Sequence, residues 1–149
     1  MKSNLKTAIY PGSFNPWHDG HNDILRKSLR VFDRVIVLRC KNPDKEENGL
    51  YAHELKYDIK KASEFWKYDP NKVDVSMWSN LLVDAIDHFK PKATAIIRGL
   101  RNGHDLQYEM NQQYTNEDLG LKIPIVYFVC DRNLGHISSS AIRAINKFK

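Results

Sequence analysis

The stretch TAIYPGSFNPWHDGHNDILRKSLRVFDRVIVL, residues 7–38, decides the fold class. It opens with a short apolar run (7–10), crosses a turn rich in glycine and proline, and continues as a helical pattern over 21–32 with its apolar residues on one side. A second apolar run, RVIVL (34–38), follows directly. A strand, a helix and another strand in this order form the unit from which parallel sheets are built.

The same alternation continues along the rest of the sequence. Predicted strands cover 7–10, 34–38, 72–77, 93–97 and 125–129, and predicted helices cover 21–32, 52–67, 81–89, 106–119 and 138–147. Short, continuously apolar strands separated by helices are typical of a parallel sheet that is covered on both faces. We therefore expect an α/β fold, a doubly wound five-stranded parallel sheet of the Rossmann-like kind, with ligands bound beyond the carboxyl ends of the strands.

Length and composition indicate an ordinary globular protein. The 149 residues suit one domain over 1–149, and 42% hydrophobic with 28% charged residues excludes disordered and low-complexity classes. No apolar stretch approaches the roughly 18 residues that span a bilayer, and the polar start lacks the apolar segment of a secretory signal, so we expect a cytoplasmic protein with no membrane partner. Cys40 and Cys130 each close an apolar run without CxxC spacing, which indicates small buried side chains rather than a disulfide framework.

The net charge and the loop after the first strand point to an anionic ligand. The charge of +5 suits such a partner but does not distinguish RNA from a small phosphate compound. In the loop PGSFNPWHDGH (11–21), Gly12 and Gly20 allow close backbone approach, and the helix start presents free N–H groups to an anion. The loop matches neither GxxxxGK[ST] nor GxGxxG, so its glycines alone are equally typical of an ordinary turn.

His18 and His21 are three residues apart at the expected start of this helix. This spacing favours two imidazoles that point into one crevice as donors to phosphate oxygens. Zinc ligation and helix capping or surface positions are the alternatives, although no cysteine or third histidine at metal spacing accompanies the pair.

Two further segments add anion-binding groups at strand ends. In IIRGLR (96–101), Arg98 directly follows the predicted strand, Gly99 permits a tight turn, and Arg101 adds a second guanidinium; the alternative is a solvated pair on a loop. In ISSSAIR (137–143), one serine suffices as a helix cap, so the other hydroxyls and the helix start form a second anion site. Three strands thus bring phosphate-binding groups to one edge of the sheet.

PGSFNPWHDGH, IRGLR and ISSSAIR together resemble the nucleotidyltransferase superfamily with an HxGH motif. IRGLR, followed by DLQYEM (105–110) and by Asn116, resembles the phosphopantetheine adenylyltransferase family more specifically, and the match spans nearly the whole chain. The resemblance implies a nucleotidyltransferase fold that transfers the adenylyl group of ATP to 4′-phosphopantetheine, giving dephospho-coenzyme A and pyrophosphate in coenzyme A biosynthesis. It also implies Mg²⁺ held mainly by the ATP phosphates, and a homo-oligomer.

The resemblance also implies which residues form the site. His21, Lys45 and Arg101 are implied as catalytic, and no protein metal ligand is expected. The residues implied to bind ATP are Ser13, Phe14, His18, His21, Gly99, Leu100, Arg101, Glu109, Leu134, Gly135, His136, Ile137, Ser138, Ser139 and Ser140. The residues implied to bind the acceptor are Ser13, Lys45, Leu82, Arg98, Tyr108 and Asn116.

Three features depart from the family pattern. Asn15 replaces the usual aspartate and removes a charge near the triphosphate, and DKEENGLY (44–51) differs after the lysine. The sequence stops at Lys149, whereas members of the family usually continue through another helix. This departure affects two features that the resemblance implies, the family's hexamer and the closure of the pantetheine pocket. The alternatives are a sibling nucleotidyltransferase with another phosphate acceptor and a non-catalytic nucleotide-binding or RNA-binding relative, although the sequence has no RNA-binding signature and we expect no nucleic-acid partner.

Overall fold

The computed structural model describes residues 6–41 and 52–148, and all five strands in this part of the chain form one parallel sheet in the order β3-β2-β1-β4-β5. The strands are β1 (Thr7–Gly12), β2 (Arg34–Cys40), β3 (Val73–Trp78), β4 (Ala95–Leu100) and β5 (Ile125–Val129). The helices are α1 (Asp19–Ser28), α2 (Ala52–Trp66), α3 (Leu82–His88), α4 (Gly103–Asp118) and α5 (Ser139–Asn146), with short 3₁₀ turns η1 (Pro70–Lys72) and η2 (Arg132–Leu134). The expected fold class is confirmed.

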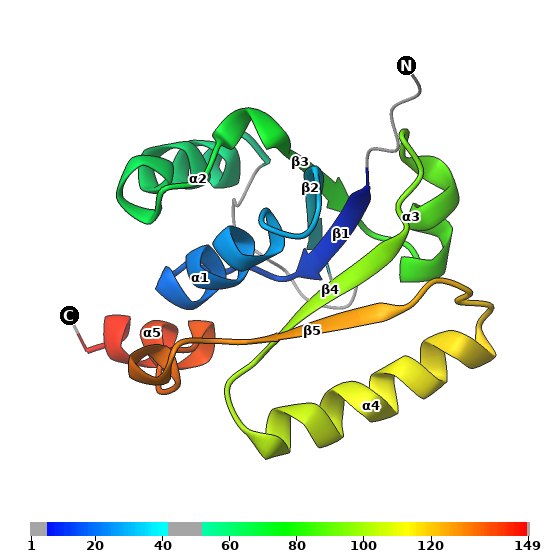
Figure 1. Ribbon diagram of the computed structural model, residues 1–149. Helices are drawn as coiled ribbons and strands as arrows, with labels where there is room; N and C mark the ends of the chain where they lie inside the picture. Colours follow the sequence, from blue (N-terminus) through cyan, green and yellow to red (C-terminus); the bar gives the residue numbers. More distant parts are fainter. Residues whose placement is uncertain (1–5, 42–51, 149) are drawn as a thin grey trace.

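Helices cover both faces of the sheet. Figure 1 shows α1, α2 and α5 on one side and α3 and α4 on the other. Because successive strand residues point to opposite faces, Ala8 and Tyr10 join the core beneath α1 and α2, whereas Ile9 joins the core beneath α3. No helix among the described residues has the length and apolar character needed to cross a membrane.

The strand order reverses next to β1. The chain winds from β1 to β2 and β3, and then returns to place β4 on the other side of β1. The β1–β4 ladder joins Ala8 to Ala95 and Ile9 to Ile96, yet β1 continues to Gly12 and β4 to Leu100. The two strands therefore separate at their carboxyl ends, which is where a doubly wound sheet binds its ligands.

Most element boundaries differ from the sequence prediction by one to four residues, and two of these differences bear on the site. β4 extends through Leu100, so Arg98 and Gly99 lie within the strand and not in a turn after it, because β5 pairs with β4 as far as Leu100 and Val129. Helix α4 begins at Gly103, where the Asn102 side chain accepts a hydrogen bond from the backbone N–H of Asp105. The apolar periodicity missed this polar first turn because it carries no apolar residue.

Gly99 allows α1 to pack closely on β4. A Cβ atom at Gly99 would lie 2.8 Å from Cγ1 of Ile24, whereas a Cβ atom at Gly103 would meet nothing within 4 Å. Ile24 is buried in the core, with 3% of its surface exposed. The absence of a side chain at Gly99 therefore sets how near the first helix lies to the site strand.

We predict that Gly99→Ala lowers the free energy of unfolding by about 1–3 kcal/mol, because Ile24 or the helix must shift to accommodate the methyl group. Urea denaturation measures the change. Gly103→Ala is the matched control and should stay within about 0.5 kcal/mol of the wild type. Equal stability of the two variants would contradict the packing explanation.

Candidate active site

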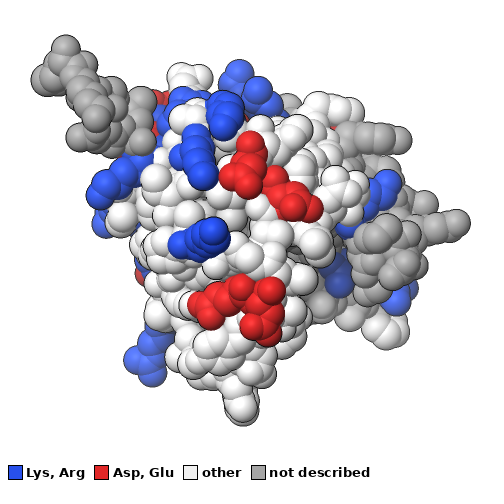
Figure 2. Space-filling model, turned by 90° about the vertical axis from the view of Figure 1, so that its right-hand side faces the viewer, with Lys and Arg blue, Asp and Glu red and all other residues white. Residues whose placement is uncertain are grey.

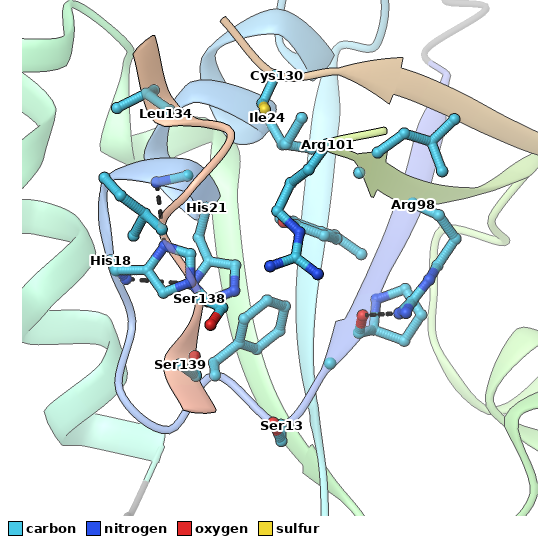
Figure 3. Close-up of a pocket in the computed structure, with 18 residues that line it drawn as sticks. Ser13, His18, His21, Ile24, Arg98, Arg101, Cys130, Leu134, Ser138 and Ser139 are labelled. Carbon is cyan, nitrogen blue, oxygen red and sulfur yellow. Dashed lines mark hydrogen bonds between the residues drawn. The ribbon is translucent and has the colours of Figure 1, made fainter. Parts of the chain in front are cut away.

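A cavity of about 240 Å³ opens where β1 and β4 separate, bounded by the start of α1 and by the segment that leads from β5 into α5. Figure 3 shows Arg98 and Arg101 on one side of it and His18, His21, Ser138 and Ser139 on the other. The predicted site residues that line the cavity are Ser13, Phe14, His18, His21, Arg98, Gly99, Leu100, Arg101, Leu134, Ile137, Ser138 and Ser139. The three sequence segments are thus brought together.

The remaining predicted site residues in the described part of the chain do not line this cavity. Lys45 lies outside the described residues. Those in the described part of the chain are Leu82 at the start of α3, Tyr108, Glu109 and Asn116 on α4, and Gly135, His136 and Ser140 near the start of α5. The cavity additionally includes Tyr10, Ile24 and Cys130, which the sequence analysis did not assign to the site.

The two histidines form a stacked pair at the start of α1. Their ring centroids are 3.7 Å apart with the planes 22° from parallel. His18 is the N-cap, and its Nδ1 accepts a hydrogen bond from the backbone N–H of Gly20 at 3.0 Å. The backbone N–H of His18 donates to Nδ1 of His21 at 3.1 Å. Since both Nδ1 atoms accept hydrogen bonds, the neutral rings carry their protons on Nε2.

The glycine between the histidines is required by this packing. A Cβ atom on Gly20 would lie 2.8 Å from Cε1 of His18. His18 therefore caps the helix, which was one of the alternatives for it, and also lines the cavity. The described residues contain no group of three or more His, Cys, Asp or Glu side chains that could hold a metal ion.

Both imidazoles are neutral near pH 7. Burial lowers the pKa of His18 to about 4, with Asp19 opposing and Arg101 adding to the effect. Burial, reinforced by His18 and Arg98, lowers the pKa of His21 well below its ordinary value. The site therefore offers uncharged N–H groups that can donate hydrogen bonds to an anionic ligand.

The arginines are both held by carboxylates from α4. Arg98 makes a bidentate pair with Glu109, at 2.8 Å from Nε and 2.7 Å from Nη2, and its Nη1 donates to the Pro11 carbonyl at 2.6 Å. Arg101 pairs with Asp105 through Nε at 3.0 Å and Nη2 at 3.1 Å. Arg101 is therefore not a loosely solvated residue, and Figure 3 shows its guanidinium extending toward the middle of the cavity.

The serines at the start of α5 have partners within the protein. The Ser138 hydroxyl accepts from the backbone N–H of Ala141 at 3.0 Å, which caps the helix. The Ser139 hydroxyl donates to the Pro16 carbonyl at 2.8 Å, and Ser140 accepts from Arg143 at 3.2 Å. The Ser139 hydroxyl thus docks the helix on the loop after β1, and the other two bond within the helix, whereas the sequence prediction had these hydroxyls as anion-binding groups.

A buried carboxylate fixes the segment between β5 and α5. Asp23, fully buried in α1, accepts from the backbone N–H of Asp131 at 2.8 Å and from Nζ of Lys27 at 2.9 Å. Although burial opposes it, these bonds and the Arg26 guanidinium hold the pKa of Asp23 below its ordinary value. The i, i+3 and i, i+4 charges in DILRK were the sequence signal for this cluster.

Comparison with known proteins identifies the family of this chain. Residues 9–145 match the profile of the cytidylyltransferase-like family. The chain belongs to that family. Within it, the chain is 37% identical over 146 residues to a phosphopantetheine adenylyltransferase of Clostridium novyi, covering 97% of this chain and 85% of the relative. It is 36% identical over 145 residues to a phosphopantetheine adenylyltransferase of Mycoplasma mycoides, covering 97% and 99%.

The resemblance to the phosphopantetheine adenylyltransferase family is therefore confirmed. A solved structure, the bifunctional NMN adenylyltransferase/ADP ribose pyrophosphatase of Francisella tularensis, superposes with a TM-score of 0.65 at 13% identity. This match covers 95% of the chain but only 42% of that structure, so the chain spans less than half of its length. At this identity the comparison establishes a shared fold and nothing further.

We predict that stability falls as the pH is lowered from about 6.5 to about 4. In this window the unfolded chain binds a proton at His18, whose ordinary pKa is 6.5, while the folded chain does not until the pH is near 4. His18→Asn keeps an N-cap acceptor but removes the titrating group, so it should lose less stability over this window. Urea denaturation at several pH values measures the effect.

The control for this titration is His104→Asn, which removes an exposed histidine from α4. The control should follow the wild-type pH dependence. Identical pH dependence of the wild type and His18→Asn would show that the buried imidazole does not contribute.

Proposed function

We propose that this protein transfers the adenylyl group of ATP to 4′-phosphopantetheine, giving dephospho-coenzyme A and pyrophosphate. The observation that carries the proposal is that relatives named phosphopantetheine adenylyltransferase align along 97% of the chain. The cavity supports it, since it joins histidine, arginine and serine side chains at the carboxyl ends of β1 and β4.

The reaction forms one phosphorus–oxygen bond and breaks another. An oxygen of the acceptor phosphate attacks the α-phosphorus of ATP, the bond from that phosphorus to the β-phosphate oxygen breaks, and pyrophosphate leaves with its electron pair. The acceptor oxygen is already ionised, so no general base is needed. Catalysis then consists of positioning and of stabilising negative charge in the transition state.

The described residues supply the donors that this chemistry needs. His21 presents its Nε2–H as a neutral donor to the α-phosphate, and Arg101 presents a permanent positive charge to the phosphate chain. Ser13 and Phe14 lie in the loop after β1, at the proposed junction of ATP and acceptor, with Arg98 beside them. Lys45 is proposed from the family resemblance to position the acceptor.

The remaining residues of the site are assigned by the same resemblance. The proposed contacts to ATP are Gly99, Leu100, Glu109 and residues 134–140, and those to the acceptor are Leu82, Tyr108 and Asn116. Glu109 is bonded to Arg98, so its proposed contribution includes orienting that guanidinium.

Magnesium is proposed to enter with ATP. None of the described residues that line the cavity is an aspartate or glutamate, and the only imidazoles there are the two whose Nδ1 atoms accept backbone hydrogen bonds. The lining therefore does not form a protein cage for the ion. Triphosphate oxygens and water suit Mg²⁺, which neutralises phosphate charge in such transfers.

The decisive test is pyrophosphate release from ATP with phosphopantetheine as acceptor. We expect turnover in the wild type and a loss of about 100-fold in His21→Ala, since one transition-state donor contributes about 3 kcal/mol. ATP affinity measured by calorimetry should change less than the rate. His104→Ala, outside the cavity, is the matched control and should retain the wild-type rate.

The same assay separates the alternatives. Turnover with nicotinamide mononucleotide or an alcohol phosphate, and none with phosphopantetheine, would identify a sibling nucleotidyltransferase. ATP binding without turnover in either the wild type or His21→Ala would favour a non-catalytic nucleotide-binding protein. Nucleic acid is not the proposed partner, because the sequence has no RNA-binding signature. On the one face drawn in Figure 2, Lys and Arg lie beside Asp and Glu.

We also propose that the protein is a homo-oligomer that associates through α4. Leu106, Met110 and Tyr114 lie four residues apart, and 38%, 40% and 53% of their surfaces are exposed. Residues at this spacing form one stripe along a helix. The partner that we propose for this stripe is a second copy of the chain, in agreement with the family resemblance.

Size-exclusion chromatography with light scattering tests this assembly. The wild type should have the mass of a multimer, and Met110→Glu should shift it toward the monomer because a buried carboxylate without a partner is costly. Gln107→Glu, which adds the same charge beside the stripe, should leave the mass unchanged. A monomeric wild type at micromolar concentration would refute the proposal.

A further inference from the structure

The end of β1 and the loop after it are held at alternate carbonyl groups by three arginines from three different elements. The pairs are Pro11 with Arg98 of β4, Ser13 with Arg39 of β2, and Asn15 with Arg143 of α5. Each guanidinium donates to a main-chain oxygen, so each contact fixes the orientation of a peptide group. The loop that contributes Ser13 and Phe14 to the cavity is thus anchored at every second residue.

Among these three arginines, Arg39 is the one whose buried position the proposed reaction does not explain. Only 1% of its surface is exposed, although it lies in a strand whose Val35 and Val37, on the same face, belong to the apolar core. Burying a guanidinium is costly unless hydrogen bonds compensate. One bond that compensates it runs from Nε to the Ser13 carbonyl at 2.9 Å.

The loop needs an external constraint at this point. Phe14 has φ of 47°, in the left-handed region that a bulky side chain rarely adopts, and its ring is buried. The ring occupies the space above Gly12, where a Cβ atom would lie 2.9 Å from it. Because a trans peptide directs C=O and N–H to opposite sides, a fixed Ser13 carbonyl also fixes the direction of the Phe14 N–H.

We propose that Arg39 is a positioning residue for the adenylyl transfer. By holding the plane of the Ser13–Phe14 peptide, it keeps both residues in the geometry required where ATP meets the acceptor. The expected effect on kcat rests on the proposed function, whereas the orientation of the Ser13–Phe14 peptide does not. Arg39 lies beneath the loop and does not line the cavity, so it acts through Ser13 and does not contact substrate.

The kinetic test is Arg39→Met, which keeps an unbranched apolar stem and removes the donor. We expect kcat per folded molecule to fall roughly 10- to 100-fold, the range that a displacement of about 1 Å at reacting groups produces. The dissociation constant of ATP, measured by calorimetry, should change much less, because the other cavity walls remain. A purely structural role would lower the folded fraction and leave kcat per folded molecule unchanged.

Arg34→Met is the matched control from the same strand. Arg34 pairs with Asp74 at 2.8 Å at the opposite end of β2, far along the strand from the loop. The Arg34→Met variant removes the same guanidinium group as Arg39→Met and should show wild-type kcat. Arg39→Lys keeps the charge and most of the stem, so it should fold, and it should show a kcat between those of the wild type and Arg39→Met.

Backbone NMR gives a readout that does not depend on the acceptor. In ¹H–¹⁵N spectra, the amide signals of Ser13 and Phe14 should shift in both Arg39 variants and stay in place in Arg34→Met. Unmoved signals together with wild-type kcat in Arg39→Lys would overturn the positioning role, even if Arg39→Met does not fold. A wild type without turnover but with shifted amides in the Arg39 variants would refute the proposed function and retain the structural role.

Discussion

The early end of the β1–β4 ladder is the constraint on which the site depends. Paired parallel strands leave no room between them, and a cavity at a sheet edge therefore needs two neighbours that stop pairing before they end. β1 and β4 pair through Ile9 and Ile96 and then separate. Arg98 spans the gap with a hydrogen bond to the Pro11 carbonyl, so the strands remain connected while the space between them is open.

The cavity contains charged groups that the protein itself compensates. Its imidazoles are neutral, as burial lowers the pKa of His18 and of His21, and its two arginines are paired with carboxylates of α4. An unpaired buried cation would cost several kcal/mol, whereas paired cations and neutral donors cost far less. Helix α4 therefore contributes to the site electrostatically, by holding guanidinium groups that a triphosphate can also contact.

The sequence predicted the sheet and the three segments of the site because these follow from local patterns. Apolar periodicity located every strand and helix, and the rule for doubly wound sheets located the cavity. The partners of individual side chains were not predictable in this way. Asp23 meets Asp131, 108 residues away, and Arg143 meets Asn15, 128 residues away, so each pair exists only once the fold has formed. For Arg39, the sequence does contain a signal, which is a charge on the apolar face of RVIVLRC. This signal does not identify the group that accepts its hydrogen bond.

The contact between α5 and the loop after β1 limits what the asparagine at position 15 changes. Arg143 reaches the main-chain oxygen of Asn15, and Ser139 reaches that of Pro16. Main-chain oxygens are present whatever the side chain, so an aspartate at this position would preserve both bonds. The asparagine therefore leaves these two contacts of α5 intact. The loop geometry depends on the arginines around it and not on the carboxylate that the family usually has there.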